Sequence, residues 1–214
     1  MHNLDRPRKI LAAALSALAG YIDAVGYLSA DRYFVSFMSG NTTRLGTDLV
    51  TGGIKAVIPA LLISGFVLGV AGGNVVGHKA GAWRKPAVLT LVTSLLAIGA
   101  VCALTHQVEV MMACLVLAMG ALNNTLRKGE TPVALTYLTG ALVRIGQGLG
   151  GMITRQRQDP AWPFMVMWFS LASGAAAGAA SFLAFGPLSL CIGAGVAALL
   201  TYAGYRITRA NRQP

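Results

Sequence analysis

Charged side chains are scarce in this sequence, and acidic side chains are the scarcest. Only 11% of the 214 residues are charged, with 7 Asp and Glu against 17 Lys and Arg, whereas about a quarter of a soluble domain is charged. Apolar residues make up 55% of the chain, and the mean hydropathy is positive. This composition excludes an ordinary soluble domain and indicates a protein embedded in a membrane.

Residues that build catalytic and metal sites are equally scarce. The cysteines and histidines are scattered singly, at Cys102, Cys114, Cys191, His2, His78 and His106. The sequence contains no CxxC pair, HExxH helix, phosphate loop or ordered set of Ser, His and Asp. We therefore expect no disulfide framework, no metal site, no cofactor and no enzymatic activity.

The formal net charge of +10 does not indicate a protein that binds nucleic acid. Such a protein gathers Lys and Arg on one face or arm, whereas here nearly all of them lie at the ends of apolar runs. Cationic side chains at that position set the orientation of membrane helices. We expect the lipid bilayer and a small-molecule or ion substrate as partners, and no nucleic acid; a homo-oligomer is left open.

Six uninterrupted apolar runs approach the length of about 20 residues that crosses a bilayer as a helix. They cover residues 10–28, 54–77, 87–104, 109–126, 162–184 and 186–205. The first follows a basic stretch, as in a signal peptide, but it continues to Ala30, and we expect it to be kept as a helix. The predicted fold class is an all-α polytopic membrane bundle that forms a single integral membrane domain over residues 1–214.

Two further stretches are long enough to cross but are interrupted by polar residues and glycine. Residues 33–50 contain FVSFMSGNTTRLG, in which an apolar start breaks into a cluster of small polar residues and Arg44. Residues 133–153 contain five glycines together with Arg144 and Gln147. Irregular backbone at membrane depth is tolerated only where it faces protein or a watery cavity. The polar cluster is therefore expected to line a cavity.

The two interrupted stretches match each other at an offset of 100 residues, when VSFMSGNTTRLGTDL is set over LTYLTGALVRIGQGL. Identical residues recur as Gly20 and Gly120, Gly40 and Gly140, Arg44 and Arg144, Gly46 and Gly146, and Leu49 and Leu149. Asp23 aligns with Asn123. The chain is therefore predicted to contain two tandem halves, residues 1–105 and 106–214.

Charge counts favour one arrangement of the interrupted stretches, because short cytoplasmic loops collect Lys and Arg. If all eight stretches cross, nine Lys and Arg lie inside and six outside. If 33–50 and 133–153 instead enter and leave on the same side, thirteen lie inside, and only Arg32 and Lys55 lie outside. The larger bias predicts six full crossings, two broken or re-entrant segments and cytoplasmic termini.

Three net crossings in each half place the second half upside down relative to the first. Such an inverted-topology repeat is a common plan of transporters, in which broken segments meet near the midplane and form the binding site. We therefore predict a secondary permease for a small solute, with a midplane site between the two broken segments. The alternatives are a channel of the same architecture and a membrane module that binds a partner or senses a ligand without transport.

The candidate substrate-binding or cavity residues lie on the first helix, on the broken segments and at the position equivalent to Asp23. They are Asp23, Ser39, Gly40, Asn41, Thr42, Arg44, Asn123, Thr139, Gly140 and Arg144. An aspartate within a membrane helix costs about 2.5–3.5 kcal/mol, so we expect Asp23 to carry a proton or to pair with Arg44 or Arg144. Two arginines related by the repeat can also hold an anion.

A purely structural role is the alternative for each of these residues. The small polar side chains can cap a helix, and the amides can form hydrogen bonds between helices. Arg44 can pair with Asp48 one turn away on the same helix. The residue types alone leave the choice between structure and binding open.

The stretch GYIDAVGYLSADRYFVSFMSGNTTRLG, followed a hundred residues on by GALNNTLRKGETPVALTYLTGALVRIG, resembles the YoaK-like family of bacterial membrane proteins. The Gly-x-x-Asp of that family falls on Gly20 and Asp23, and its Gly-Asn-Thr block falls within residues 34–46, with Ser39 at the usual Thr position. The usual Gln before the second-half Asn is Leu122 here. The resemblance covers nearly the whole chain and implies a multi-pass protein of the bacterial inner membrane with about six helices.

Overall fold

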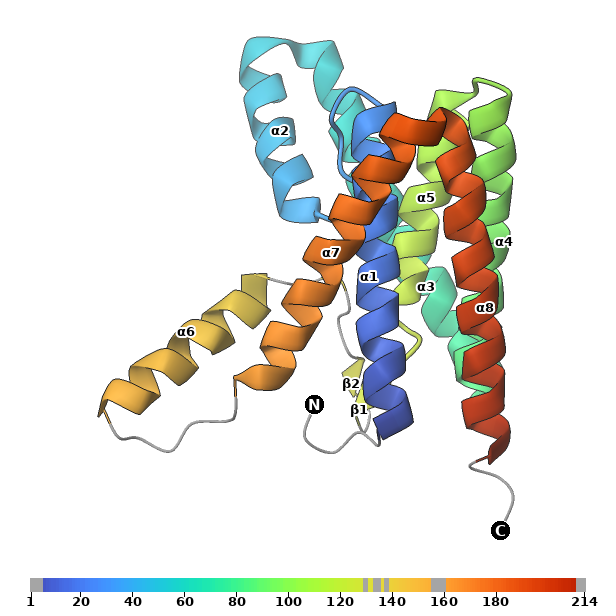
Figure 1. Ribbon diagram of the computed structural model, residues 1–214. Coiled ribbons are helices and arrows are strands. Elements are labelled where there is room, and N and C mark those ends of the chain that lie inside the picture. Colours follow the sequence, from blue (N-terminus) through green and yellow to red (C-terminus); the bar gives the residue numbers. More distant parts are fainter. Residues whose placement is uncertain (1–5, 129–130, 133–135, 137–138, 155–160, 211–214) are drawn as a thin grey trace.

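The computed structural model describes residues 6–128, 131–132, 136, 139–154 and 161–210, and it is almost entirely helical (Figure 1). The helices are α1 (Arg6–Ser29), α2 (Met38–Thr51), α3 (Val57–Lys79), α4 (Arg84–Leu104), α5 (Val108–Leu122), α6 (Thr139–Thr154), α7 (Trp162–Phe185) and α8 (Ser189–Ala210). Short 3-10 helices, η1 (Gly53–Ala56), η2 (Gly81–Trp83) and η3 (Gly186–Leu188), lie in three connections. Two short strands, β1 (Arg127–Lys128) and β2 (Thr131–Pro132), pair antiparallel. The predicted helical fold is confirmed, and each of the six apolar runs overlaps one helix.

Glycine allows the tight turns between consecutive long helices. Gly81 lies between α3 and α4, and Gly186 lies between α7 and α8, with φ of 54° and 55°. Residues with a Cβ rarely adopt a positive φ of this size, whereas glycine does so readily. The two helix pairs can therefore fold back on themselves within a few residues.

Figure 1 shows the path of the chain along the bundle. After α1 rises, the chain turns back, and α2 begins part-way down α1 and rises again. α3 descends, α4 rises and α5 descends; α6 then begins near mid-height and runs down and outward, before α7 rises and α8 descends. α2 and α6 thus begin within the height of the bundle, and each returns to the end at which the preceding long helix finished.

Basic residues gather at one end of the bundle (Figure 1). The start of α1, the turn from α3 to α4, β1 and the end of α8 together contain Arg6, Arg8, Lys9, Lys79, Arg84, Lys85, Arg127, Lys128, Arg206 and Arg209. The connection from α1 to α2 and η1, at the opposite end, contain Arg32 and Lys55. This asymmetry is the one that marks a cytoplasmic end in membrane proteins.

Helices of one predicted half pack mainly on helices of the other. α1 packs along α7, α5 packs along α3, and α4 packs along α8. A Cβ on Gly20 would meet the backbone of Leu171, and a Cβ on Gly120 would meet the backbone of Phe66. Gly20 and Gly120 are 100 residues apart, and Phe66 and Leu171 are 105 apart, so equivalent helices make equivalent contacts once five extra residues before Trp162 are allowed for.

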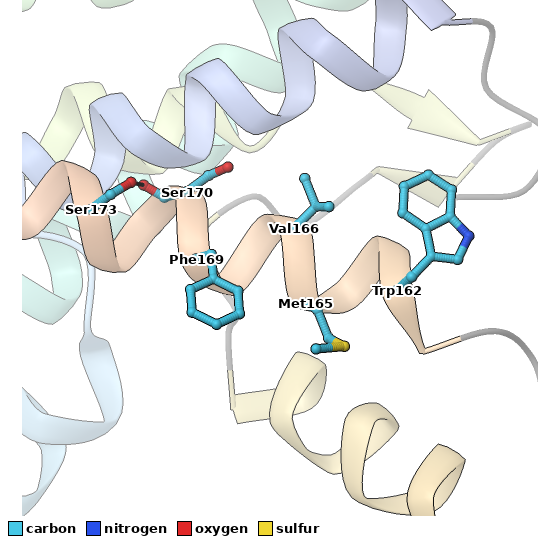
Figure 2. A pocket seen from close by; sticks show the side chains of 6 residues that line it. All are labelled: Trp162, Met165, Val166, Phe169, Ser170 and Ser173. Atoms are coloured by element: carbon cyan, nitrogen blue, oxygen red, sulfur yellow. Dashed lines mark hydrogen bonds between the residues drawn. The ribbon is translucent and has the colours of Figure 1, made fainter. Parts of the chain in front are cut away.

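α2 and α6 do not pack against each other in the described part of the chain. α2 contacts α3 and η1, whereas α6 contacts α7, beside which it lies in Figure 2. The helical parts of the two broken segments therefore form no site by direct packing on each other, whereas most of residues 133–138 lie outside the described residues.

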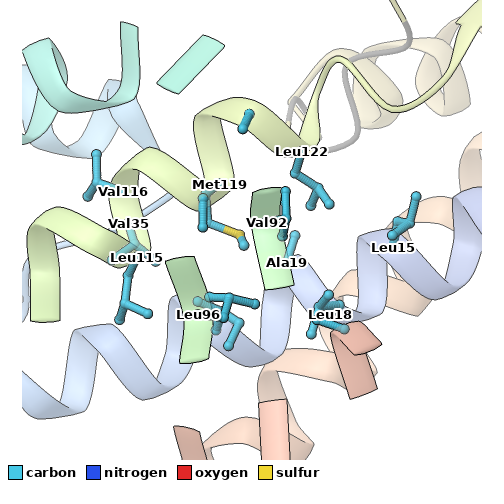
Figure 3. Close-up of a cluster of buried hydrophobic side chains, with 14 of the residues drawn as sticks. Leu15, Leu18, Ala19, Val35, Val92, Leu96, Leu115, Val116, Met119 and Leu122 are labelled. Carbon is cyan, nitrogen blue, oxygen red and sulfur yellow. The ribbon is translucent and has the colours of Figure 1, made fainter. Parts of the chain in front are cut away.

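The buried core lies between α1, α4 and α5 (Figure 3). Its labelled members are Leu15, Leu18 and Ala19 of α1, Val92 and Leu96 of α4, Leu115, Val116, Met119 and Leu122 of α5, and Val35. Val35 lies outside any helix, and its side chain is fully buried. The extended chain before α2 is therefore anchored in the core by an apolar side chain.

Four segments of the described chain are long and apolar enough to cross a membrane. They are Arg6–Ser29, Gly53–Lys79, Gly81–Leu104 and Trp162–Ala210, the last of which contains both α7 and α8. α5 is apolar but shorter, at about 22 Å for 1.5 Å per residue. Large apolar side chains are exposed on the outer helix faces, as Leu183 is at 81%. The protein is therefore a helical membrane protein.

Candidate functional site

Asp23 of α1 binds the extended chain that precedes α2. Its Oδ1 accepts hydrogen bonds from the backbone N–H groups of Val35 (2.8 Å) and Ser36 (3.0 Å), and its Oδ2 accepts one from Ser36 Oγ (3.0 Å). All three hydrogen bonds have distances of 2.8–3.0 Å, which are typical of well-formed bonds. Asp23 therefore fastens the chain at residues 35 and 36 to the wall of α1.

Asn41 of α2 binds the same stretch from the other side. Its Oδ1 accepts a hydrogen bond from the N–H of Phe34 (3.2 Å), and its Nδ2 donates one to the carbonyl of Phe34 (2.7 Å). The amide thus pairs with both backbone groups of one residue, as a neighbouring strand would. We call Phe34–Ser36, held by Asp23 and Asn41, the clamped segment.

The clamp explains how non-helical chain can lie within the height of the bundle. All three N–H groups of the clamped segment are bonded to side chains, so none of them needs water. Asn41 is fully buried, and Ser36 is 6% exposed. For Asn41, the expected lining of a watery cavity is therefore wrong, because its amide is buried and bonded to the backbone of Phe34 and to Met38 Sδ (3.8 Å).

The second predicted half repeats the Asp23 side of the clamp with an amide in place of the carboxylate, whereas the position equivalent to Asn41 is Ala141. Asn123 Oδ1 accepts a hydrogen bond from the N–H of Thr136 (3.3 Å), and Asn123 Nδ2 donates one to Thr136 Oγ1 (3.1 Å). Asn123 and Thr136 align with Asp23 and Ser36 at the offset of 100 residues. The same contact is therefore made twice, at equivalent places in the two halves.

Arg44 of α2 closes the turn that follows α1. Its Nη1 donates hydrogen bonds to the carbonyls of Asp31 (2.8 Å) and Arg32 (2.9 Å), and its guanidinium lies 3.9 Å from the centroid of the Tyr33 ring. Asp31 and Arg32 have φ of 40° and 61°, a region that residues other than glycine rarely adopt. Arg44 thus stabilises a strained turn, and the cation over the ring adds about 0.5–2 kcal/mol.

The predicted salt bridges of these residues are wrong. In the part of the chain that the structure describes, neither Arg44 nor Arg144 pairs with Asp23, whose oxygens are taken by the clamped segment. The alternative partner of Arg44, Asp48, has a buried Oδ2 with no hydrogen bond there. The pairs of Arg44 failed because its guanidinium binds the carbonyls of Asp31 and Arg32, while Asp23 binds the backbone of Val35 and Ser36.

Arg144 of α6 has surroundings different from those of Arg44. It shares a helix face with Ala141 and Gly148, at spacings of three and four residues. These two residues are buried, whereas Arg144 is exposed. A Cβ on Gly148 would lie 2.8 Å from the Cβ of Ala161, beside the start of α7. Arg144 therefore faces the bundle near the contact with α7 without being enclosed by it.

The remaining predicted residues lie at the starts of α2 and α6. Ser39, Thr42 and Thr139 are exposed, and the hydroxyl of Thr42 donates to the carbonyl of Met38 (2.8 Å). Gly40 has a steric role, because a Cβ there would lie 2.6 Å from Cδ1 of the Phe37 ring. Gly140 is half-buried at the equivalent position of α6.

Sequence reasoning missed a polar contact between α4 and the end of α5. Arg84 donates from Nε to the carbonyl of Asn124 (3.0 Å) and from Nη2 to Asn74 Oδ1 (3.2 Å). Asn124, which is 2% exposed, donates from Nδ2 to the carbonyl of Val70 (2.9 Å). The signal in the sequence was the pair Asn123 and Asn124 at the end of an apolar run. Only the packing of distant helices shows that Asn124 binds Arg84.

Metal and cofactor ligands do not gather anywhere in the described residues. No three His, Cys, Asp or Glu side chains lie there close enough to hold a metal ion. The polar groups that the structure does bring together are carboxylate, amide and hydroxyl groups bound to backbone. The arrangement is suited to holding chain segments in place at membrane depth.

Comparison with known proteins gives one family and one curated relative. The family described as "Protein of unknown function (DUF1275)" matches residues 11–203. A UPF0700 transmembrane protein from Rhizobium meliloti (strain 1021) is 41% identical over 201 residues, which cover 93% of this chain and 87% of the relative. No solved structure matches the chain.

Proposed function

The chain belongs to the DUF1275 family and is a helical membrane protein, and from this premise we propose that it is a secondary permease that moves a small solute across the bacterial inner membrane. The YoaK-like resemblance of its motifs is confirmed by this membership. The proposal rests on the repeated clamp, in which Asp23 with Ser36 and Asn123 with Thr136 hold non-helical chain beside a long helix.

An inverted repeat of two three-crossing halves is part of the proposal. Its support is the exchange of partners between the halves, since α1 lies on α7 in the same way that α5 lies on α3. Six crossings are part of the proposal, and they are supported by the four long apolar segments, the last of which contains both α7 and α8, together with the shorter apolar helix α5. Transporters built from inverted repeats use broken segments of this kind near the midplane.

The solute site is proposed at the starts of the two short helices, one in each half. Helix starts carry a partial positive charge. At the start of α2 the N–H groups of Met38 and Gly40 are already bonded to the carbonyls of Ser36 and Phe37, so the exposed hydroxyls are the groups offered to a solute. The start of α2 has no side-chain cap at Phe37, and Ser39 and Thr42 are exposed within its first turns. Thr139 is exposed at the equivalent start of α6, and Arg144 follows on the same helix. Each short helix would stay fixed to its own half by the contact of Asp23 or Asn123, while the two halves move relative to each other.

The experiment that tests the proposal measures solute uptake by the purified protein in proteoliposomes. We expect saturable uptake of at least one small solute, driven by an imposed ion or solute gradient. Flux that stays proportional to solute concentration would instead favour a channel. Flux equal to that of empty vesicles over a broad solute panel, together with copurification of a protein partner, would replace the proposal with a non-transporting module.

The orientation is a separate prediction, with the basic end and both termini in the cytoplasm. Lys79 and Thr105 are exposed at opposite ends of the bundle. In protein whose native cysteines are replaced by alanine, we expect Thr105→Cys to react with an impermeant maleimide in intact cells. Lys79→Cys should react only after permeabilisation. Reaction of both positions from one side would contradict the crossings between them.

A further inference from the structure

A shallow groove runs along the outer face of α7 (Figure 2). It has a volume of about 570 Å³ and is lined by Trp162, Met165, Val166, Phe169, Ser170 and Ser173. These positions are spaced by three and one residues in turn and form one stripe of the helix. Figure 2 shows Met165 and Phe169 pointing to the side on which α6 lies. The groove is therefore a long, mostly apolar depression beside α6.

One end of the groove carries positive charge. Lys9 Nζ lies 5.9 Å from the ring centroid of Trp162, and Arg6, on the same first turn of α1, is exposed. This is the basic end of the bundle, where tryptophan and lysine side chains of membrane proteins meet lipid headgroups. The other end of the groove, at Ser173, is three turns further along α7 and within its apolar length.

We propose that the groove binds an anionic phospholipid of the same leaflet. Its acyl chain would lie along Met165, Val166 and Phe169, and its phosphate would lie beside Lys9. A basic pocket between membrane helices at the cytoplasmic side is suited to anionic headgroups, and a neutral groove would give no preference among lipids. Lipid binding at this groove requires only that the chain lies in a membrane and does not depend on the proposed transport.

Native mass spectrometry of the full-length protein in detergent tests the proposal. Phosphatidylglycerol and phosphatidylcholine with identical acyl chains are added as probes, so that only the headgroup charge differs. We expect phosphatidylglycerol to bind about five-fold more tightly, which is the effect of one cation near a lipid surface. Equal affinity for the two lipids would overturn the proposal.

Charge variants locate the headgroup end. Lys9→Gln should remove most of the five-fold preference for phosphatidylglycerol. Lys55→Gln makes the same charge change at the opposite end of the bundle, where Lys55 is exposed on η1, and should leave the preference unchanged. Similar losses in the two variants would show a response to net charge and would overturn the proposed site.

Groove-filling variants locate the acyl chain without altering charge. Ser173→Phe should lower the binding of both lipids at least several-fold, because the ring occupies the end of the groove. Ala180→Phe adds the same bulk two turns further on the same exposed face of α7 and should have little effect. If Ser173→Phe changes the oligomeric state and leaves lipid binding unaltered, a second copy of the chain covers the groove and the proposal fails.

Discussion

Gly174→Leu is expected to leave little or no folded protein, because it forces α1 and α7 apart. A Cβ at Gly174 would overlap the backbone of Ala17, and one turn further a Cβ at Gly178 would overlap the backbone of Tyr21. Overpacking that side chains can relieve costs about 1–3 kcal/mol, but backbone cannot rotate out of the way, so the loss should exceed this range. The measurement is the yield of monodisperse protein and its thermal stability in detergent.

Gly195→Leu provides the matched control for that experiment. Gly195 lies within α8, and a Cβ there would meet nothing within 4 Å. The same change in side chain should therefore cost nothing by overlap, and the higher helix propensity of leucine should even favour it slightly, as it does at Gly174. If Gly174→Leu and Gly195→Leu were equally stable, the close crossing of α1 and α7 would be contradicted.

Asp23→Leu is expected to release the clamped segment from α1, with a large loss of stability. The change removes all three hydrogen bonds of the carboxylate and leaves the N–H groups of Val35 and Ser36 without a partner. Each buried N–H group that lacks an acceptor costs about 1–3 kcal/mol. Within a bilayer there is no water to replace the lost acceptor. Thermal unfolding in detergent, followed by the loss of monodisperse protein, measures this effect.

Asp23→Asn separates the clamp from any role of the charge. The amide can still accept from the two N–H groups and can donate to Ser36 Oγ, as Asn123 does with Thr136. We therefore expect this variant to stay close to wild type in stability and, in the uptake assay, in the pH dependence of transport. A loss as large as that of Asp23→Leu would show that the negative charge itself is required, as in proton coupling.

The small polar residues at the start of α2, Ser39–Thr43, thus have two different roles in the structure. Asn41 and Gly40 serve the backbone and the packing of Phe34 and Phe37, so their residue types follow from local geometry. Ser39 and Thr42 are exposed and are the members left to contact a solute. Substitutions at Asp23 therefore test how the clamped segment is held in the fold. Substitutions at Ser39 or Thr42 test the proposed solute site.

The sequence by itself determined the class of protein and the course of the chain. Long apolar runs can only be satisfied as helices in lipid, so the ranges of α1, α3, α4, α7 and α8 followed closely from hydropathy. The offset of 100 residues also pointed to Asp23 and Asn123 as equivalent positions, which the structure uses in the same kind of contact. The lengths of apolar runs and the match at an offset of 100 residues can both be found in the sequence without knowledge of the fold.

Only the tertiary structure decided what each polar group binds. Asp23 was expected to meet an arginine, yet it binds backbone of residues 35 and 36, and Arg44 binds the carbonyls that follow α1. It also decided that α2 packs on α3 and that α6 packs on α7, while close glycine contacts such as that of Gly174 with Ala17 join the long helices. Hydrogen-bond partners depend on distances of about 3 Å between segments far apart in the chain, and residue types alone do not specify such distances.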